Sequence, residues 1–178
     1  SSMGGKGHAI AVVNGTAALH LALLAVGVRP DDEVLVPALT FIAPANAVRY
    51  TGAWPVFVDA ETDYWQMDVE QIGSFLDERC NIGPDGLRNS ATGRRVSAIL
   101  PVHILGHPVD MAPLLELAKH YHLAVVGDAT ESFGALYRGE LVGTLGDLGC
   151  LSFNGNKLLT TGGGGIVFTP DEAVAQQV

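Results

Sequence analysis

The chain has 178 residues, 48% of them hydrophobic, which is enough for one domain with a sizeable core. Its net charge of −9, with no basic cluster larger than Arg94 and Arg95, argues against nucleic acid as a partner. The longest apolar runs are too short to span a membrane, and no signal-peptide pattern opens the sequence, so we expect a cytoplasmic protein.

Apolar strand-like runs and helical patterns alternate along the chain. Strands are predicted at 8–13, 33–36, 55–59, 96–103, 123–128, 149–153 and 165–169. Helices are predicted at 16–26, 41–50, 69–78 and 111–120. Residues 80–95 are the one long polar loop that the sequence predicts. The alternation indicates an α/β domain with a mostly parallel sheet.

The first strand runs through a turn of small residues, Asn14 to Ala17, into the first predicted helix. Backbone N–H groups at such a helix start, together with the Thr16 hydroxyl, can hold a dianionic phosphate. The segment could equally be an ordinary helix start capped by Asn14. It matches neither the nucleotide P-loop nor the G-x-G-x-x-G dinucleotide fingerprint.

Phe41 follows the second predicted strand and opens a helix of small residues. A ring at the end of a strand can stack on a flat cofactor, but such a ring more often belongs to the core. From its spacing alone, we expect Phe41 in the core.

Asp128 ends the run LAVVGD, which is typical of a buried parallel strand with a carboxylate at its carboxyl edge. Ligands of α/β sheets bind outside these strand ends. An aspartate there can keep a pyridinium nitrogen protonated, as pyridoxal phosphate (PLP) enzymes require. The alternative is a cap for the next helix.

Lys157 lies in a loop of small residues between the last two predicted strands, whereas the other two lysines, Lys6 and Lys119, lie in a Gly-rich stretch and a helical pattern. A lysine that forms a Schiff base needs a partly desolvated site, so that its amine can be neutral. Lys157 could also be a surface cation in a turn. A lysine one strand after Asp128 is a more specific combination than either residue alone.

Metal binding is not favoured by the remaining pattern. His103 and His107 have the i, i+4 spacing of many zinc pairs, but Gly106 and Pro108 interrupt any helix there. His103, at the end of a predicted strand, could instead face a substrate. The two cysteines form no C-x-x-C motif, and Cys150 is predicted to be a buried thiol.

Taken together, these segments resemble the DegT/StrS family of PLP-dependent nucleotide-sugar aminotransferases. The matching blocks occur in family order: NGTAAL at 14–19, PALTFIA at 37–43, NAV at 46–48, PVFVD at 55–59, PVHILGHP at 101–108, DATES at 128–132, GTLGDLGC at 143–150 and SFNGNK at 152–157. The resemblance covers nearly the whole chain. It implies the large domain of a fold-type I PLP enzyme, here residues 1–178 with seven strands, without the family's smaller C-terminal domain.

The resemblance also implies roles for individual residues. Lys157 would form the Schiff base with PLP and then move the proton during amino transfer. Asp128 would pair with the pyridine nitrogen and Phe41 would stack on the ring. The phosphate would be held by Gly15, Thr16, Ala17 and Ser152. Glu131 stands where the family often has Gln near the ring hydroxyl, and Gly127 stands where it often has an acid.

The implied reaction moves an amino group from L-glutamate to a nucleotide-linked 4-keto-6-deoxy sugar. The retained Lys157 separates the chain from dehydratase relatives in which His replaces the lysine. The NGNK motif and the polar insert at 89–95 are similar to 4-aminotransferases of the bacillosamine and legionaminic acid pathways, whose substrates are UDP-linked. Family members are homodimers. Two alternatives stay open: a PLP-dependent aminohydroxybenzoate synthase and a non-catalytic PLP-binding module.

Overall fold

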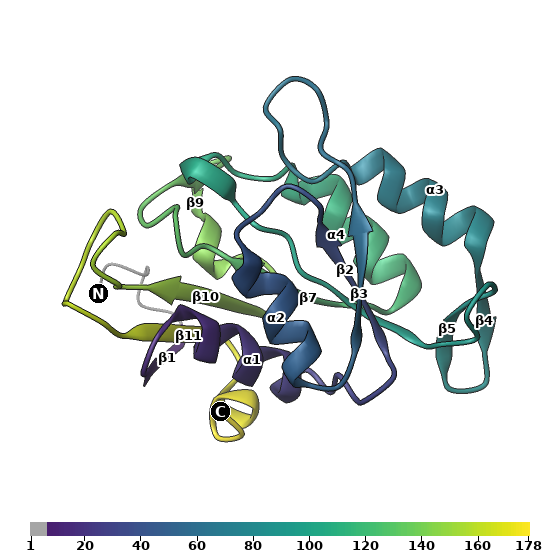
Figure 1. Cartoon of the computed structure of the whole chain (residues 1–178), viewed down its shortest axis with the longest axis horizontal. Helices are drawn as coiled ribbons and strands as arrows, with labels where there is room; N and C mark the ends of the chain where they lie inside the picture. The colour runs from purple at the N-terminus through teal and green to yellow at the C-terminus, as the bar shows by residue number, and fades with distance from the viewer. Residues whose placement is uncertain (1–6) are drawn as a thin grey trace.

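The computed structural model describes residues 7–178, so that Lys6 lies outside the described residues. A seven-stranded sheet with the order β1-β11-β10-β7-β6-β2-β3 forms the centre (Figure 1). Its strands, in chain order, are β1 His8–Val12, β2 Glu33–Pro37, β3 Trp54–Val58, β6 Val96–Ile99, β7 Ala124–Asp128, β10 Leu148–Ser152 and β11 Gly165–Thr169.

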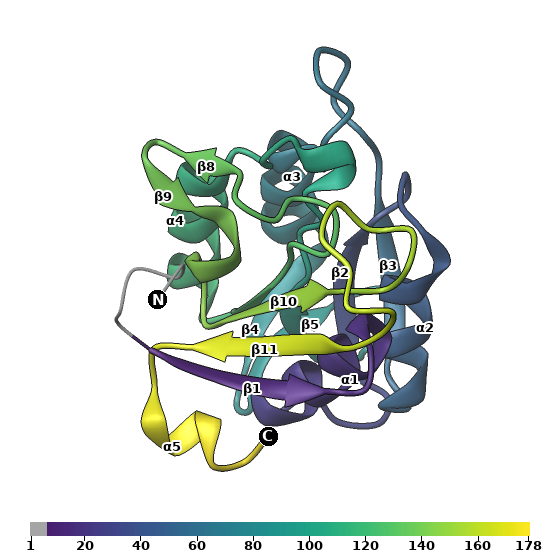
Figure 2. The same ribbon diagram turned by 90° about the vertical axis from the view of Figure 1, so that its left-hand side faces the viewer.

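The five neighbouring strands from β10 to β3 are parallel, which confirms the prediction of a mostly parallel sheet. Strand β11 is antiparallel to both β10 and β1, and Figure 2 shows these three strands side by side. Strand β1 therefore runs in the same direction as the parallel set. Its carboxyl end meets those of β2, β6, β7 and β10 at a single edge of the sheet.

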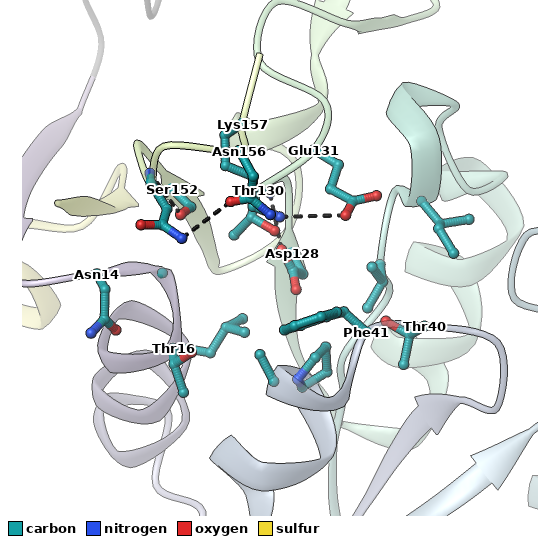
Figure 3. Close-up of a pocket in the computed structure, with 17 residues that line it drawn as sticks. Asn14, Thr16, Thr40, Phe41, Asp128, Thr130, Glu131, Ser152, Asn156 and Lys157 are labelled. Carbon is teal, nitrogen blue, oxygen red and sulfur yellow. Dashed lines mark hydrogen bonds and ion pairs between the residues drawn. The ribbon is translucent and has the colours of Figure 1, made fainter. Parts of the chain in front are cut away.

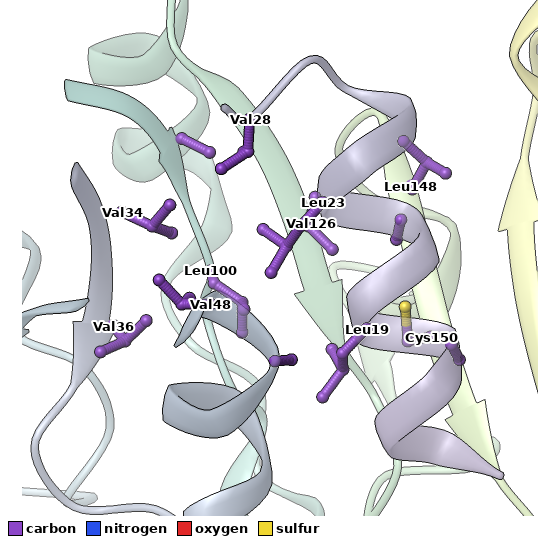
Figure 4. Close-up of a cluster of buried hydrophobic side chains, with 14 of the residues drawn as sticks. Leu19, Leu23, Val28, Val34, Val36, Val48, Leu100, Val126, Leu148 and Cys150 are labelled. Atoms are coloured by element: carbon purple, nitrogen blue, oxygen red, sulfur yellow. The ribbon is translucent and has the colours of Figure 1, made fainter. Parts of the chain in front are cut away.

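Helices cover both faces of the sheet, because its central strands are apolar on both sides. One core lies beneath α1 (Gly15–Ala25) and α2 (Ile42–Tyr50) and includes Leu19, Leu23 and Cys150 (Figure 4). Burial of Cys150 confirms the sequence prediction and raises the pKa of its thiol. A second core lies beneath α3 (Val69–Arg79) and α4 (Met111–Tyr121), and a short helix, α5 (Glu172–Ala175), ends the chain.

The prediction of a loop at 80–95 was wrong in part. Strands β4 (Cys80–Gly83) and β5 (Gly86–Asn89) form a hairpin there, and the buried Glu33 accepts hydrogen bonds from Asn89 Nδ2 at 2.9 Å and from the Thr92 hydroxyl at 2.8 Å. Only Cys80, Ile82 and Leu87 of its eight strand residues carry apolar side chains, so the sequence shows no apolar run long enough to mark it. A tertiary contact, not a local pattern, fixes the segment.

The predicted strand at 96–103 is shorter in the structure. Strand β6 ends at Ile99, because Pro101 has no backbone N–H for a sheet hydrogen bond. The chain then continues into a single 3₁₀ turn, η1 (Ile104–Gly106). Elements that the sequence did not predict are β8 (Leu136–Tyr137), β9 (Glu140–Leu141) and η2 (Val142–Thr144).

Across residues 7–178, no helix has the length and apolar content needed to cross a membrane.

Strand β10 approaches η2 so closely that only glycine fits at position 149. A Cβ atom at Gly149 would lie 2.0 Å from the Gly143 carbonyl oxygen. We predict that Gly149→Ala lowers the free energy of unfolding by about 3 kcal/mol, because backbone has to move to admit the methyl group. The measurement is chemical denaturation of the wild type and the variant.

The matched control is Gly73→Ala, inside α3, where the added methyl would meet only Leu117 at 3.8 Å. Since alanine favours a helix more than glycine does, this control should be neutral or stabilised by up to about 1 kcal/mol. If both variants lost the same free energy of unfolding, the close approach of β10 to η2 would not be what restricts position 149 to glycine.

Candidate active site

A cavity of about 290 Å³ opens at the carboxyl edge of the sheet (Figure 3). Seven of the eight site residues predicted from the sequence line it: Gly15, Thr16, Phe41, Asp128, Glu131, Ser152 and Lys157. They come from the ends of β1, β2, β7 and β10 and from the loops that follow. The shared direction of these strands thus brings together residues that are up to 142 positions apart, from Gly15 to Lys157.

Asp128 ends β7 and lies deep in this site, with only 3% of its surface exposed. Its Oδ1 accepts a hydrogen bond from the Thr130 backbone N–H at 3.0 Å. Burial raises the pKa of the carboxyl group, while the Thr130 hydrogen bonds and the charge of Lys157 partly oppose this shift. Asp128 is therefore a costly buried carboxylate that lacks a full counter-charge.

Lys157 lies in the loop between β10 and β11, and its Nζ is 3.3 Å from Oε1 of Glu131. The lysine side chain is 16% exposed, so it is not the surface cation that the alternative interpretation required. The loop turns at this point, where the Lys157 backbone N–H donates to the Asn154 carbonyl oxygen at 3.0 Å. The amine thus faces a cavity wall that carries two carboxylates.

The start of α1 faces Ser152 at the other end of the cavity. A Cβ atom at Gly15 would lie 2.8 Å from Cβ of Ser152, so a side chain there would fill the space beside the Ser152 hydroxyl. The start of a helix supplies N–H groups and a positive dipole end to this space. The expectation for Ala17 differs from what the structure shows: its N–H donates to Oδ1 of the capping Asn14 at 2.8 Å, and Ala17 does not line the cavity.

Phe41 caps α2 and is 67% exposed, so the expectation of a core position was wrong. Its backbone is extended where α2 begins. In Figure 3, the ring lies on the opposite side of the site from Lys157 and Glu131, with Asp128 between them.

The sequence did not single out Thr40 and Thr130, which also line the cavity. The Thr40 hydroxyl oxygen is buried and has no hydrogen-bond partner within residues 7–178. Both threonines immediately precede a residue that the sequence did single out. Their position next to Phe41 and Glu131, at the strand ends, was the signal that could have identified them.

His103 does not face the cavity, contrary to the expectation from sequence. Its ring is fully buried, Nδ1 bonds with the Val109 backbone N–H at 3.1 Å, and burial lowers its pKa to about 4. His107 instead stacks on Tyr64, with ring centroids 4.5 Å apart. In the part of the chain that the structure describes, no three His, Cys, Asp or Glu side chains gather as a metal site would require.

The model of the DegT/DnrJ/EryC1/StrS aminotransferase family matches residues 2–178. The chain belongs to this family. It is 46% identical to GDP-perosamine synthase from Escherichia coli O157:H7, over 94% of the chain and 42% of that relative. It is 44% identical to GDP-perosamine synthase from Caulobacter vibrioides, over 98% of the chain and 43% of that relative. The chain thus spans less than half the length of these relatives.

A third relative is a UDP-N-acetyl-3-dehydro-alpha-D-glucosamine 3-aminotransferase from Acidithiobacillus ferrooxidans, with 38% identity over 100% of the chain and 44% of the relative. Among solved structures, a family member from Brucella abortus superposes with a TM-score of 0.87 at 34% identity, covering 97% of this chain and 44% of that one. A 3-amino-5-hydroxybenzoic acid synthase gives 0.82 at 36% identity, covering 97% and 41%.

A structure from Bacillus subtilis that contains bound cofactor PMP gives a TM-score of 0.80 at 32% identity, covering 97% of this chain and 35% of that one. The central sheet is therefore the large-domain sheet of fold-type I PLP enzymes, as the sequence predicted.

The buried charge of Asp128 leads to a prediction for the cofactor-free protein. Because the folded pKa is raised, the folded state holds a proton that the unfolded state releases as the pH rises above about 4. The carboxyl group therefore destabilises the fold at neutral pH, and Asp128→Asn should raise the thermal midpoint at pH 7. Its amide oxygen can still accept the Thr130 hydrogen bond.

The difference in thermal midpoint between Asp128→Asn and the wild type should shrink as the pH falls toward 4, because the native carboxyl group, with its raised pKa, takes up a proton. Thermal unfolding between pH 4 and pH 8 measures it. An Asp128→Asn protein that is less stable than the wild type at pH 7 would contradict the buried-charge account.

Proposed function

We propose that the protein containing this chain is a PLP-dependent aminotransferase that acts on a nucleotide-linked sugar, and that residues 1–178 form its large PLP-binding domain. The observation that carries the proposal is the meeting of Lys157 and Asp128 in one cavity, with the start of α1 and Ser152 at its other end. This cofactor requires three groups: an amine, a buried carboxylate and a site that binds its phosphate.

The cavity residues fit the cofactor in three respects. Gly15 leaves open the space beside Ser152 and the start of α1 that a phosphate group would occupy. Asp128, whose pKa is raised by burial, lacks the full counter-charge that a protonated ring nitrogen would supply. The exposed face of Phe41 offers a surface against which a flat ring can stack.

Each residue then has a defined task. When bound, PLP supplies an aldehyde that captures amines and a ring that accepts the electron pair released at the substrate carbon. Asp128 Oδ1 accepts the Thr130 N–H, and the carboxylate would accept a hydrogen bond from the protonated ring nitrogen and so keep that nitrogen protonated. Lys157 Nζ holds the cofactor and, once released, carries a proton from one carbon to the next.

We propose L-glutamate as the amino donor and a 4-keto-6-deoxy sugar as the acceptor. The NGNK motif suggested a UDP-linked sugar, and one relative is named for a UDP-linked substrate. The two relatives named GDP-perosamine synthase favour a GDP-linked sugar instead. We also propose that the protein is cytoplasmic and that it forms a homodimer. Exposed apolar side chains at the cavity (Phe41) and next to Lys157 (Leu158) support the homodimer.

The solved 3-amino-5-hydroxybenzoic acid synthase supports one competing function, an aromatisation on the same fold. A non-catalytic PLP-binding module is less favoured, because Lys157 and Asp128 are both retained and share one cavity. An acceptor screen separates these three possibilities.

We predict that Lys157→Ala in the full-length natural protein lowers kcat by at least about 10³-fold, because the proton carrier is lost. The assay follows 2-oxoglutarate formation from L-glutamate with a sugar-nucleotide acceptor. Lys119→Ala, on α4 away from the cavity, is the matched control and should keep the wild-type rate. Full activity in Lys157→Ala would refute the proposed role.

The donor and acceptor are tested by separate half-reactions. L-glutamate should convert the absorbance of the PLP-loaded protein to that of the pyridoxamine form, and a GDP-linked 4-keto-6-deoxy sugar should restore the original spectrum. If only the UDP-linked sugar restored the original spectrum, the acceptor would be UDP-linked and not GDP-linked. A spectrum that ignores glutamate and every keto sugar would contradict the proposed reaction.

A further inference from the structure

Glu131 connects two walls of the cavity through a single carboxylate. Its Oε1 lies 3.3 Å from Nζ of Lys157, as the dashed line in Figure 3 shows, and its Oε2 accepts the Leu105 backbone N–H at 3.0 Å. Lys157 belongs to the loop after β10, whereas Leu105 belongs to the turn η1 after β6. The sequence separates the two by 52 residues, and Glu131 spans the gap.

The turn η1 contains a residue in a strained backbone conformation. Leu105 has a φ of 55°, a left-handed conformation that side chains other than glycine rarely adopt. Its side chain is 88% exposed, so packing of that side chain does not compensate for the strain. Two side chains from outside the turn bond to its backbone: Glu131 accepts the Leu105 N–H, and Gln66 Nε2 donates to the Ile104 carbonyl oxygen at 3.3 Å. Ile104 also lines the cavity.

The charges around Glu131 make this contact depend on Lys157. Of the described residues that line the cavity, Lys157 is the one with a positive charge, while Asp128 and Glu131 carry the negative ones. The Glu131 side chain is 30% exposed, so its position is not fixed by burial alone. A carboxylate held between a cation and an N–H group becomes freer to move when the cation is removed.

We propose that Glu131 is a positioning residue that couples the charge of Lys157 to the conformation of the turn η1. While Lys157 is charged, Glu131 holds both the amine and the wall of the cavity formed by Ile104. When Lys157 is not charged, the wall is held less firmly and yields to a substrate. The role given to Lys157 rests on the proposed function, but the coupling itself is a property of the cofactor-free protein.

Hydrogen–deuterium exchange of the cofactor-free, full-length natural protein tests the coupling, with peptides that cover η1. Glu131→Ala removes both contacts and should speed exchange of the Leu105 amide about tenfold. Glu131→Gln keeps an oxygen for the Leu105 N–H but loses the ion pair. Lys157→Met loses the same ion pair from the other side. These two variants should each speed exchange about threefold.

The double variant Glu131→Gln with Lys157→Met should exchange no faster than either single variant, because both remove one shared interaction. The control Glu140→Gln, at an exposed glutamate in β9, should leave exchange in η1 unchanged. Peptides from β7 report the global stability of each variant, so a general loss of structure is recognised.

The coupling would be overturned if η1 exchanged at the wild-type rate in Lys157→Met. It would also be overturned if the double variant exchanged faster than either single variant, by the product of their two effects. Neither result depends on catalysis. A protein that shows the coupling but no transamination would contradict the proposed function alone, whereas an active aminotransferase without the coupling would contradict this inference alone.

Discussion

The parallel pairing of β10 with β7 is the constraint on which the site depends. Its register places Cys150 beside Asp128, so the chain that leaves β10 begins next to the buried carboxylate. The loop after β10 then carries Lys157 to the wall of the same cavity. Glycine at position 149 lets η2 pack against β10, where a Cβ atom would meet the Gly143 carbonyl oxygen.

The site concentrates unfavourable electrostatics at one edge of a well-packed sheet. Asp128 is buried with a raised pKa, the Thr40 hydroxyl oxygen has no partner within the described residues, and Glu131 adds a second negative charge nearby. Such groups reduce stability unless a ligand pairs with them. The two hydrophobic cores beneath the helices supply the stability that lets the sheet carry them.

Apolar runs and helix starts were sufficient to predict the strands and helices that form the sheet and its two layers. Asp128 and Lys157 could be placed at one edge of the sheet because Asp128 ends a buried strand and Lys157 follows another, where α/β proteins bind ligands. The β4–β5 hairpin could not, since the contacts of Glu33 with Asn89 and Thr92 hold it.

Side-chain orientation was the harder problem at the site. Spacing alone put Phe41 in the core, although the family resemblance put it at the site, and it put His103 toward the substrate. Sequence spacing does not show how the backbone turns after a strand. Phe41 lies where α2 begins and its ring turns outward, whereas His103 lies beyond the end of β6 and its ring turns into the interior. The link from Glu131 to Leu105 joins separate loops and has no local signature at all.

The central claim is that Lys157 is the residue that holds the cofactor. The most direct measurement is borohydride reduction of the full-length natural protein loaded with PLP, followed by proteolysis and mass spectrometry of the peptides. A phosphopyridoxyl group is expected on the peptide that contains Lys157, and no such group on the peptide that contains Lys119. A label on another lysine, or no label at a PLP concentration that saturates binding, would contradict it.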